Sequence, residues 1–216
     1  MPRLLLLPLF LLMTASAASE IADHPEQVRP LLPGQSVPTF EIKSVTGEAV
    51  HVDPAEFEKP VVLTFYRGGW CPYCNLHLAE LRHAEERLSE MGFDVWFVSP
   101  DRPELLADGQ DAAQGYALYS DSDAVAAKAF GVAFRLDDDT HAQYQGFGVD
   151  ITERAGTEHR ALPVASTFLI GTDGIVQFSF ANPDYTVRLH PDVLLAAAEA
   201  YLDESHERLR RQRRQD

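Results

Sequence analysis

The sequence predicts an α/β protein in which a central mixed β-sheet is flanked by helices on both faces. Three observations predict this class: short β-rich runs alternate with amphipathic segments, the pattern opens as strand-helix-strand, and it closes with a hairpin and a helix. A strand-helix-strand unit gives parallel neighbours with the helix on one face, and a hairpin gives antiparallel neighbours. The 216 residues, 45% of them hydrophobic, suit one compact domain with additional end segments.

The first strands are predicted from two kinds of pattern. Segments 38–43 and 48–52 alternate apolar and polar residues around a Thr-Gly pair, which is typical of a β-hairpin with one buried face. Segment 61–66 is an uncharged run of β-branched, aromatic and leucine residues, which indicates a strand buried on both faces. A Gly-Gly pair then ends this strand.

Helical periodicity follows this strand. Between residues 72 and 91 apolar residues recur at helical spacing, and Gly92 suits the position just after a helix end. The chain then continues with a strand at 93–98, a short helix at 102–108, a brief strand at 117–119 and a helix at 122–130.

Segment 133–162 is the least regular part of the chain. It is expected to be either a functional insertion over the site or a mobile loop. Segments 166–170 and 175–180 then predict a second hairpin, and a final helix begins near His190. Because the elements follow the order of the thioredoxin fold, we expect a thioredoxin-like domain over residues 34–203.

Residues 1–17 have the features of a secretory signal peptide. Arg3 supplies a positive charge, residues 4–13 form an apolar run, and small residues at 15–17 provide a cleavage site. The apolar run is too short to span a bilayer, so no stable membrane insertion is expected. We therefore expect a secreted or periplasmic protein, cleaved near Ala17, in a compartment that permits disulfides.

The remaining end segments and the overall charge limit the possible partners. Residues 18–33 are polar and contain prolines, so we expect an exposed lead-in. Residues 204–216 form a basic tail, interpreted as a solvated helix end or, alternatively, as a contact for an anionic membrane surface or partner. The net charge of −15 argues against binding to nucleic acid, which requires clustered lysines and arginines on the folded surface.

The chain has two cysteines, Cys71 and Cys74, and they lie where a buried strand passes into an amphipathic helix. Unpaired N–H groups in the first turn of a helix stabilise a thiolate and lower its pKa below the usual value of about 8.5. A spacing of three residues in that turn brings the sulfurs close enough to bond, and Pro72 suits the helix start. The pair therefore predicts a reversible dithiol–disulfide couple that needs no cofactor.

Other uses of the two cysteines are possible from the residues alone. Haem attachment needs a histidine directly after the second cysteine, and Asn75 stands there instead. Cys71, Cys74 and His77 together offer a copper or zinc site, as in a metal-binding assembly protein, which stays open as an alternative. A purely structural disulfide would close a very small loop and stabilise little. Redox chemistry is favoured, and no metal is expected.

Residues 65–74, Phe-Tyr-Arg-Gly-Gly-Trp-Cys-Pro-Tyr-Cys, resemble the peroxiredoxin-like branch of the AhpC/TSA family. The resemblance extends from about residue 34 to residue 201. Its supporting segments are 37–42, 120–123, 129–132, 167–174 and 182–188. It implies a thioredoxin-like fold and a thiol peroxidase that reduces hydroperoxides and is itself reduced by a thioredoxin-like or other dithiol.

The resemblance also implies roles for the two cysteines. Peroxiredoxins carry a Pro-x-x-x-Thr-x-x-Cys segment whose last residue attacks peroxide, and here Arg67, Cys71 and Cys74 occupy its three defined positions. Cys74 would then be oxidised to a sulfenic acid, and Cys71 would resolve it as a disulfide. Thioredoxins assign the opposite roles, with Cys71 as the nucleophile. An exported thiol–disulfide oxidoreductase acting on protein cysteines is therefore the alternative function.

The chain departs from both families near its second hairpin. Typical peroxiredoxins have an arginine, and thioredoxin-like reductases a cis-proline, at the position that Ala165 occupies here. We expect Arg67 to supply the positive charge beside the thiolate, with a surface arginine that caps a loop as the alternative. Trp70 and Tyr73 are expected to shape the rim of the substrate pocket or to pack on the strand beneath. Asp101 is a polar loop residue with no supporting cluster.

Overall fold

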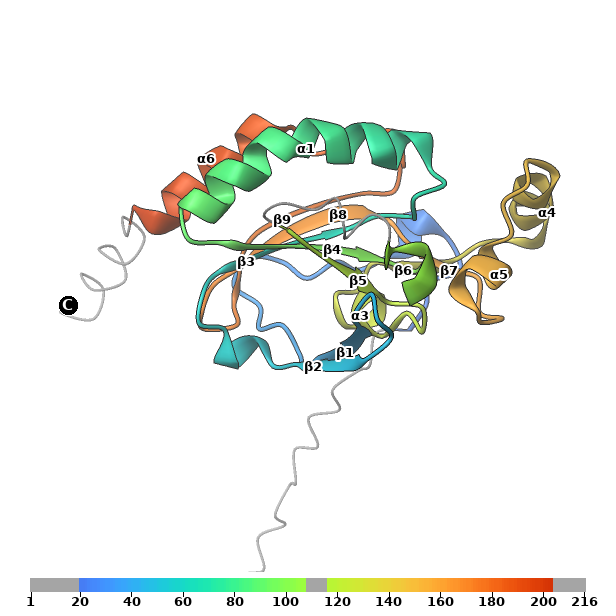
Figure 1. Cartoon of the computed structure of the whole chain (residues 1–216), viewed down its shortest axis with the longest axis horizontal. Helices are drawn as coiled ribbons and strands as arrows, with labels where there is room; N and C mark the ends of the chain where they lie inside the picture. Colours follow the sequence, from blue (N-terminus) through green and yellow to red (C-terminus); the bar gives the residue numbers. More distant parts are fainter. Residues whose placement is uncertain (1–19, 108–115, 204–216) are drawn as a thin grey trace, which may run out of the picture.

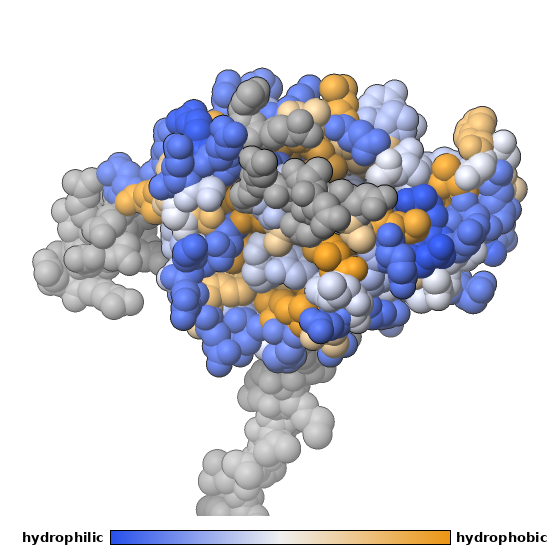
Figure 2. Space-filling view, viewed as in Figure 1, coloured by the Kyte–Doolittle hydropathy of each residue, from blue (hydrophilic) through white to orange (hydrophobic). Residues whose placement is uncertain are grey.

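The computed structural model describes residues 20–107 and 116–203. The predicted signal peptide at 1–17 and the basic tail at 204–216 lie outside these residues. Within the described part, no helix combines the length and apolar character needed to cross a membrane. Figure 2 shows that the face in view is mostly hydrophilic, in keeping with the high content of acidic residues.

A seven-stranded mixed sheet forms the centre of the domain, in the order β2-β1-β5-β4-β3-β8-β9. The strands are β1 (Phe40–Lys43), β2 (Ala49–Val52), β3 (Val61–Phe65), β4 (Asp94–Ser99), β5 (Ala117–Ser120), β8 (Ala165–Ile170) and β9 (Val176–Asn182). The pairs β3–β4 and β4–β5 are parallel, whereas β8 and β9 continue the sheet in antiparallel pairs. Both predicted hairpins are confirmed.

Helices cover both faces of this sheet, as predicted. On one face α1 (Pro72–Glu90) packs beside α6 (Pro191–Leu202), and on the other lies the short α3 (Val125–Ala129) (Figure 1). Leu81, Leu88 and Leu194 bury the apolar faces of α1 and α6 against the sheet. A second core lies on the α3 side, where the Phe130 ring packs on Phe168 with centroids 4.8 Å apart. The sheet is therefore covered by apolar contacts on both faces.

The segment 133–162, left open as an insertion or a mobile loop, is folded throughout. It contains β6 (Ala133–Arg135), α4 (Asp138–Gly146), α5 (Ile151–Ala155) and β7 (Ala161–Pro163), with β6 and β7 paired antiparallel. α4 stands away from the central sheet (Figure 1). The sequence did not reveal α4 because its one buried residue, His141, gives no apolar periodicity. Asp137 and Asp150 cap the two helices by accepting hydrogen bonds from backbone N–H groups.

Two predicted helices differ from the expectation. In the segment 102–108, Pro103–Leu105 forms a 3₁₀ turn, and residue 108 lies outside the described residues. Another 3₁₀ turn lies at Pro54–Glu56. The helix expected from 122 begins only at Val125, because Ala124 adopts a left-handed conformation with φ of 55°. The Asp121 carboxylate then accepts the N–H groups of Ala126 and Ala127, at 2.9 and 2.8 Å, and so fixes the start of α3.

The lead-in is less exposed than the sequence predicts. A 3₁₀ turn at Pro25–Gln27 lies between apolar residues that pack against the core, namely Ile21, Ala22, Val28 and Leu31. The Arg29 N–H donates to the carbonyl of Gly131, and a Cβ at residue 131 would lie 2.0 Å from the Arg29 carbonyl oxygen. Only glycine allows this close approach of the two backbones.

Candidate active site

The loop between β3 and α1 is held by buried contacts that fix the start of the helix. Gly68 has φ of +127°, and a Cβ there would meet both Trp70 and Asp101 within 2.7 Å. The Gly69 N–H donates to Asp101 Oδ2 over 3.1 Å, while Arg154 donates twice to the same carboxylate at 2.8 Å. Asp101, which the sequence did not favour, is therefore a structural anchor of this loop, and its partner Arg154 comes from α5.

The two cysteines occupy the first turn of α1 as free thiols, each only 2% exposed. Cys71 is the N-cap residue and Cys74 lies three residues on. A hydrogen bond from the Cys74 thiol lowers the pKa of Cys71 to about 6, and the Cys74 backbone N–H and the charges of Arg67 and Arg188 act in the same direction. That hydrogen bond, burial and the negative charge on Cys71 raise the pKa of Cys74. At neutral pH the pair therefore shares one proton and one negative charge.

A small cavity opens beside Cys74. Its lining includes Cys74, Thr167, Arg67 and Arg188, and its volume of about 10 Å³ admits roughly one water-sized molecule. An Arg188 guanidinium N–H points at the Cys74 sulfur, with 3.6 Å between Nη2 and Sγ. Sequence reasoning missed Arg188 as a site residue, although it ends the 182–188 segment that carries part of the family resemblance. A pocket of this size, with two arginines among otherwise largely apolar walls, suits the –OOH end of a hydroperoxide.

Arg188 lines the same cavity as Ala165, the position at which typical peroxiredoxins have an arginine. Ala165 begins β8, lines the same cavity and pairs with Asn182 of β9. Arg188 lies in the connection from β9 to α6, six residues after Asn182, and enters the cavity from this neighbouring segment. The positive charge beside Cys74 thus comes from a different part of the chain.

Arg67 is buried rather than at the surface, with 3% of its area exposed. Its guanidinium lies over the rings of Trp70, Tyr144 and Tyr185, at 5.2, 5.4 and 4.6 Å from their centroids. Its Nη2 also donates a hydrogen bond to the Tyr144 hydroxyl. The alternative of a surface arginine that caps a loop is therefore wrong, and Arg67 lines the same cavity as Cys74.

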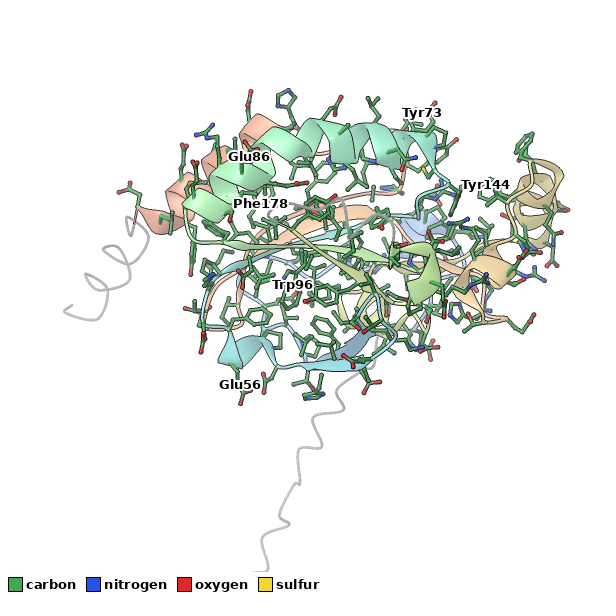
Figure 3. The ribbon with its side chains drawn as sticks, viewed as in Figure 1. Glu56, Tyr73, Glu86, Trp96, Tyr144 and Phe178 are labelled. Carbon is green, nitrogen blue, oxygen red and sulfur yellow. The ribbon has the colours of Figure 1, made fainter. Side chains whose placement is uncertain are left out.

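The two predicted rim residues lie in different environments. Trp70 is half-buried and meets Tyr144 edge to face, with centroids 5.3 Å apart. Tyr73 is 46% exposed and meets Tyr185 in the same way at 5.5 Å. Figure 3 shows Tyr73 at the N-terminal end of α1 and Tyr144 between that end and α4. Neither Trp70 nor Tyr73 is among the residues that line the cavity beside Cys74, so the structure does not place them at its rim.

The metal-binding alternative finds no support in the part of the chain that the structure describes, where no three His, Cys, Asp or Glu side chains form a possible metal site. His77 is buried, and its Nε2 lies 3.1 Å from the carbonyl oxygen of Leu189. Burial lowers the pKa of His77, so the ring is neutral at pH 7 and Nε2 carries the donated proton. This contact holds the segment next to Arg188.

Comparisons with known proteins agree with this geometry. A sequence model described as the AhpC/TSA family matches residues 33–179. The chain is 27% identical over 169 residues to peroxiredoxin Bcp from Escherichia coli K12, covering 78% of this chain and 96% of the relative. It is 30% identical over 107 residues to a putative peroxiredoxin bcp from Haemophilus influenzae, covering 49% of this chain and 68% of the relative.

Solved structures show the same fold. Peroxidoxin BcpB from Mycobacterium tuberculosis superposes with a TM-score of 0.57 at 24% identity, covering 78% of this chain and 96% of the other. Reduced Prx3 from Vibrio vulnificus in complex with hydrogen peroxide gives a TM-score of 0.62 at 21% identity, with coverages of 79% and 98%. The thioredoxin-like fold expected from the order of elements is confirmed.

Proposed function

The chain belongs to the AhpC/TSA family and is a thiol-dependent peroxidase, and we propose that Cys74 attacks the hydroperoxide and Cys71 resolves the product. One observation carries this assignment: Cys74, not Cys71, lines the water-sized cavity into which Arg188 points. The alignment of residues 67–74 with the peroxiredoxin segment implied the same roles for the two cysteines. An exported oxidoreductase of protein cysteines is not favoured, because the relatives named above are peroxiredoxins.

The shared hydrogen bond lowers the pKa of Cys71 and raises that of Cys74, which favours the negative charge on Cys71 and the proton on Cys74. As the Cys74 sulfur attacks the terminal peroxide oxygen, its proton passes along the existing hydrogen bond to Cys71. An S–O bond forms and the O–O bond breaks, so Cys74 is oxidised to a sulfenic acid while the peroxide is reduced. The alkoxide or hydroxide leaving group is protonated by solvent, and Cys71, whose pKa is lowered, releases the proton it received and becomes a thiolate again. Arg188 supports this step by donating to the reacting oxygen and sulfur.

Resolution uses the thiolate that the first step restores on Cys71. This sulfur attacks the sulfenic sulfur of Cys74, an S–S bond forms, and the released hydroxide is protonated by solvent. A thioredoxin-like protein or another dithiol then returns two electrons by thiol–disulfide exchange and becomes a disulfide itself. The cycle requires no chemistry beyond the two sulfurs, the two arginines and these external reactants.

The peroxidase proposal is tested by mixing reduced protein with one equivalent of hydrogen peroxide and following thiol loss by stopped flow. We expect a second-order rate far above that of a free low-molecular-weight thiol. The rate should fall as the pH drops through about 6, because Cys71 is then protonated and can no longer accept the proton of Cys74. A rate no faster than the free thiol at pH 7 would contradict the proposal.

We further propose that residues 1–17 direct export, on the evidence of the charged, apolar and small-residue pattern of that segment. Expression of the full chain in a bacterial host should yield a protein whose N-terminus, determined by mass spectrometry, is Ala18. The Ala17→Phe variant should keep its full length, because signal peptidase requires a small residue at that position. Recovery of the uncleaved wild-type chain in the cytoplasmic fraction would contradict export.

A further inference from the structure

The strongest feature that the mechanism leaves unexplained is the environment of Arg67. Its guanidinium is buried, and within the described residues its hydrogen bonding is limited to the one donated to Tyr144. Its Nε is fully buried and has no hydrogen-bond partner there. The remaining stabilisation comes from the faces of three aromatic rings, which attract a cation but set its position loosely. A directional contact is therefore needed to fix where this charge lies.

Tyr144 supplies that contact from a part of the chain far from the cysteines in sequence. It lies on α4, which is capped by Asp137 and tied to the start of α5. Gln145 donates to Asp150 over 2.7 Å, and buried His141 lies 3.5 Å from the same carboxylate. α4 is thus held firmly enough to place a hydroxyl group against Arg67.

We propose that Tyr144 is a positioning residue of the active site: it fixes the Arg67 guanidinium beside the Cys71–Cys74 pair and so sets how readily the pair ionises. α4 then contributes a residue that supports the active site, although it stands away from the central sheet. The chemical consequence for turnover rests on the peroxidase function proposed above, but the ionisation itself does not.

Several other groups face the pair and must be kept constant in any test. Arg188 contributes a second positive charge from the β9–α6 connection. His77 on α1 lines the same cavity, and burial keeps it neutral at pH 7. Tyr66, at the end of β3, also stays neutral because burial raises its pKa. Among the described residues, the Tyr144 hydroxyl forms a hydrogen bond with Arg67 and with none of these three residues. Removing the hydroxyl therefore isolates the effect of Arg67.

The test replaces Tyr144 by phenylalanine, which keeps the ring and removes the hydroxyl. We expect the pKa of Cys71, measured from thiolate absorbance at 240 nm, to rise by about 0.5, because the arginine charge is less well placed. The thiolate fraction at pH 6 should fall about twofold. Phe147→Ala is the matched control: Phe147 ends α4, is 74% exposed and lies outside the site, so the pKa should not change.

A double variant decides whether Tyr144 acts through Arg67. Arg67→Gln should itself raise the pKa of Cys71, and adding Tyr144→Phe should then change it little. An unchanged or lowered pKa in Tyr144→Phe, or a full additional rise in the Arg67→Gln background, would overturn the proposal. Circular dichroism checks that each variant is folded. If Arg67→Gln does not fold, the comparison of Tyr144→Phe with the wild type still tests the proposal. Since the titration uses no peroxide, failure of the peroxidase proposal would show separately.

Discussion

Replacing Cys74 by serine is expected to abolish peroxide consumption, lowering the rate by several orders of magnitude. A hydroxyl group cannot form a sulfenic acid, and the cavity beside residue 74 offers the peroxide no other sulfur. Cys71→Ser should behave differently. Its Cys74 should still react once, consuming one equivalent of peroxide, but the product should remain a sulfenic acid that dimedone traps. Mass spectrometry of the trapped adduct distinguishes the two variants.

The cysteine experiment also tests the opposite order of attack. The lowered pKa of Cys71 favours the thiolate on this residue, which makes it the alternative nucleophile. If Cys71 attacked first, the pattern would be reversed. Cys74→Ser would then form the trapped adduct and Cys71→Ser would be inactive. Stopped-flow rates add a check. Because Cys71→Ser also removes the proton acceptor of Cys74, this variant should react more slowly than the wild type above pH 6, where wild-type Cys71 can accept the proton.

The second large effect is expected at Arg188. Arg188→Met keeps the length of the side chain but removes the charge and the N–H group that points at the Cys74 sulfur. We expect the rate constant for peroxide to fall about 10²-fold, because the donor stabilises charge that shifts onto oxygen as the O–O bond breaks. The pKa of Cys71 should also rise, since the Arg188 charge favours its thiolate.

Arg87→Met is a matched control for this variant. Arg87 lies on α1, is largely exposed and forms an ion pair with Glu199 at 2.9 Å, away from the cavity. Its removal should leave the rate unchanged, because exposed ion pairs contribute little. Equal rates for Arg188→Met and the wild type, with both proteins folded, would show that Arg188 does not take part in the reaction.

The centre of the fold could be predicted because local patterns determine it. The uncharged run of β3 is buried at all five positions, and the apolar spacing of α1 matches its packing against the sheet. The position of the cysteine pair followed from the junction of these two elements. α4 could not be predicted, because a short polar helix with one buried residue has no periodic pattern to detect.

The residues around the sulfurs were harder to predict because they come from distant parts of the chain. Arg188 is 114 residues from Cys74, and Tyr144 is 77 residues from Arg67. No local pattern reveals such contacts. The pairing of β8 with β3 and β9 brings the segment of Arg188 beside the cysteines, whereas Tyr144 comes from α4, between the paired strands β6 and β7. The absence of an arginine at position 165 was visible and Arg67 was predicted to supply the charge, but Arg188, which points at the Cys74 sulfur, was not predicted.

The cavity beside Cys74 sets a size limit on what reaches the sulfur. With both cysteines 2% exposed and room for roughly one water-sized molecule, the hydroperoxyl head of a substrate enters while any substituent stays outside. We therefore expect hydroperoxides to differ little at the reacting atom, because this common head is the part that the cavity admits. The same limit keeps bulky thiols and disulfides away from Cys74 in the conformation described.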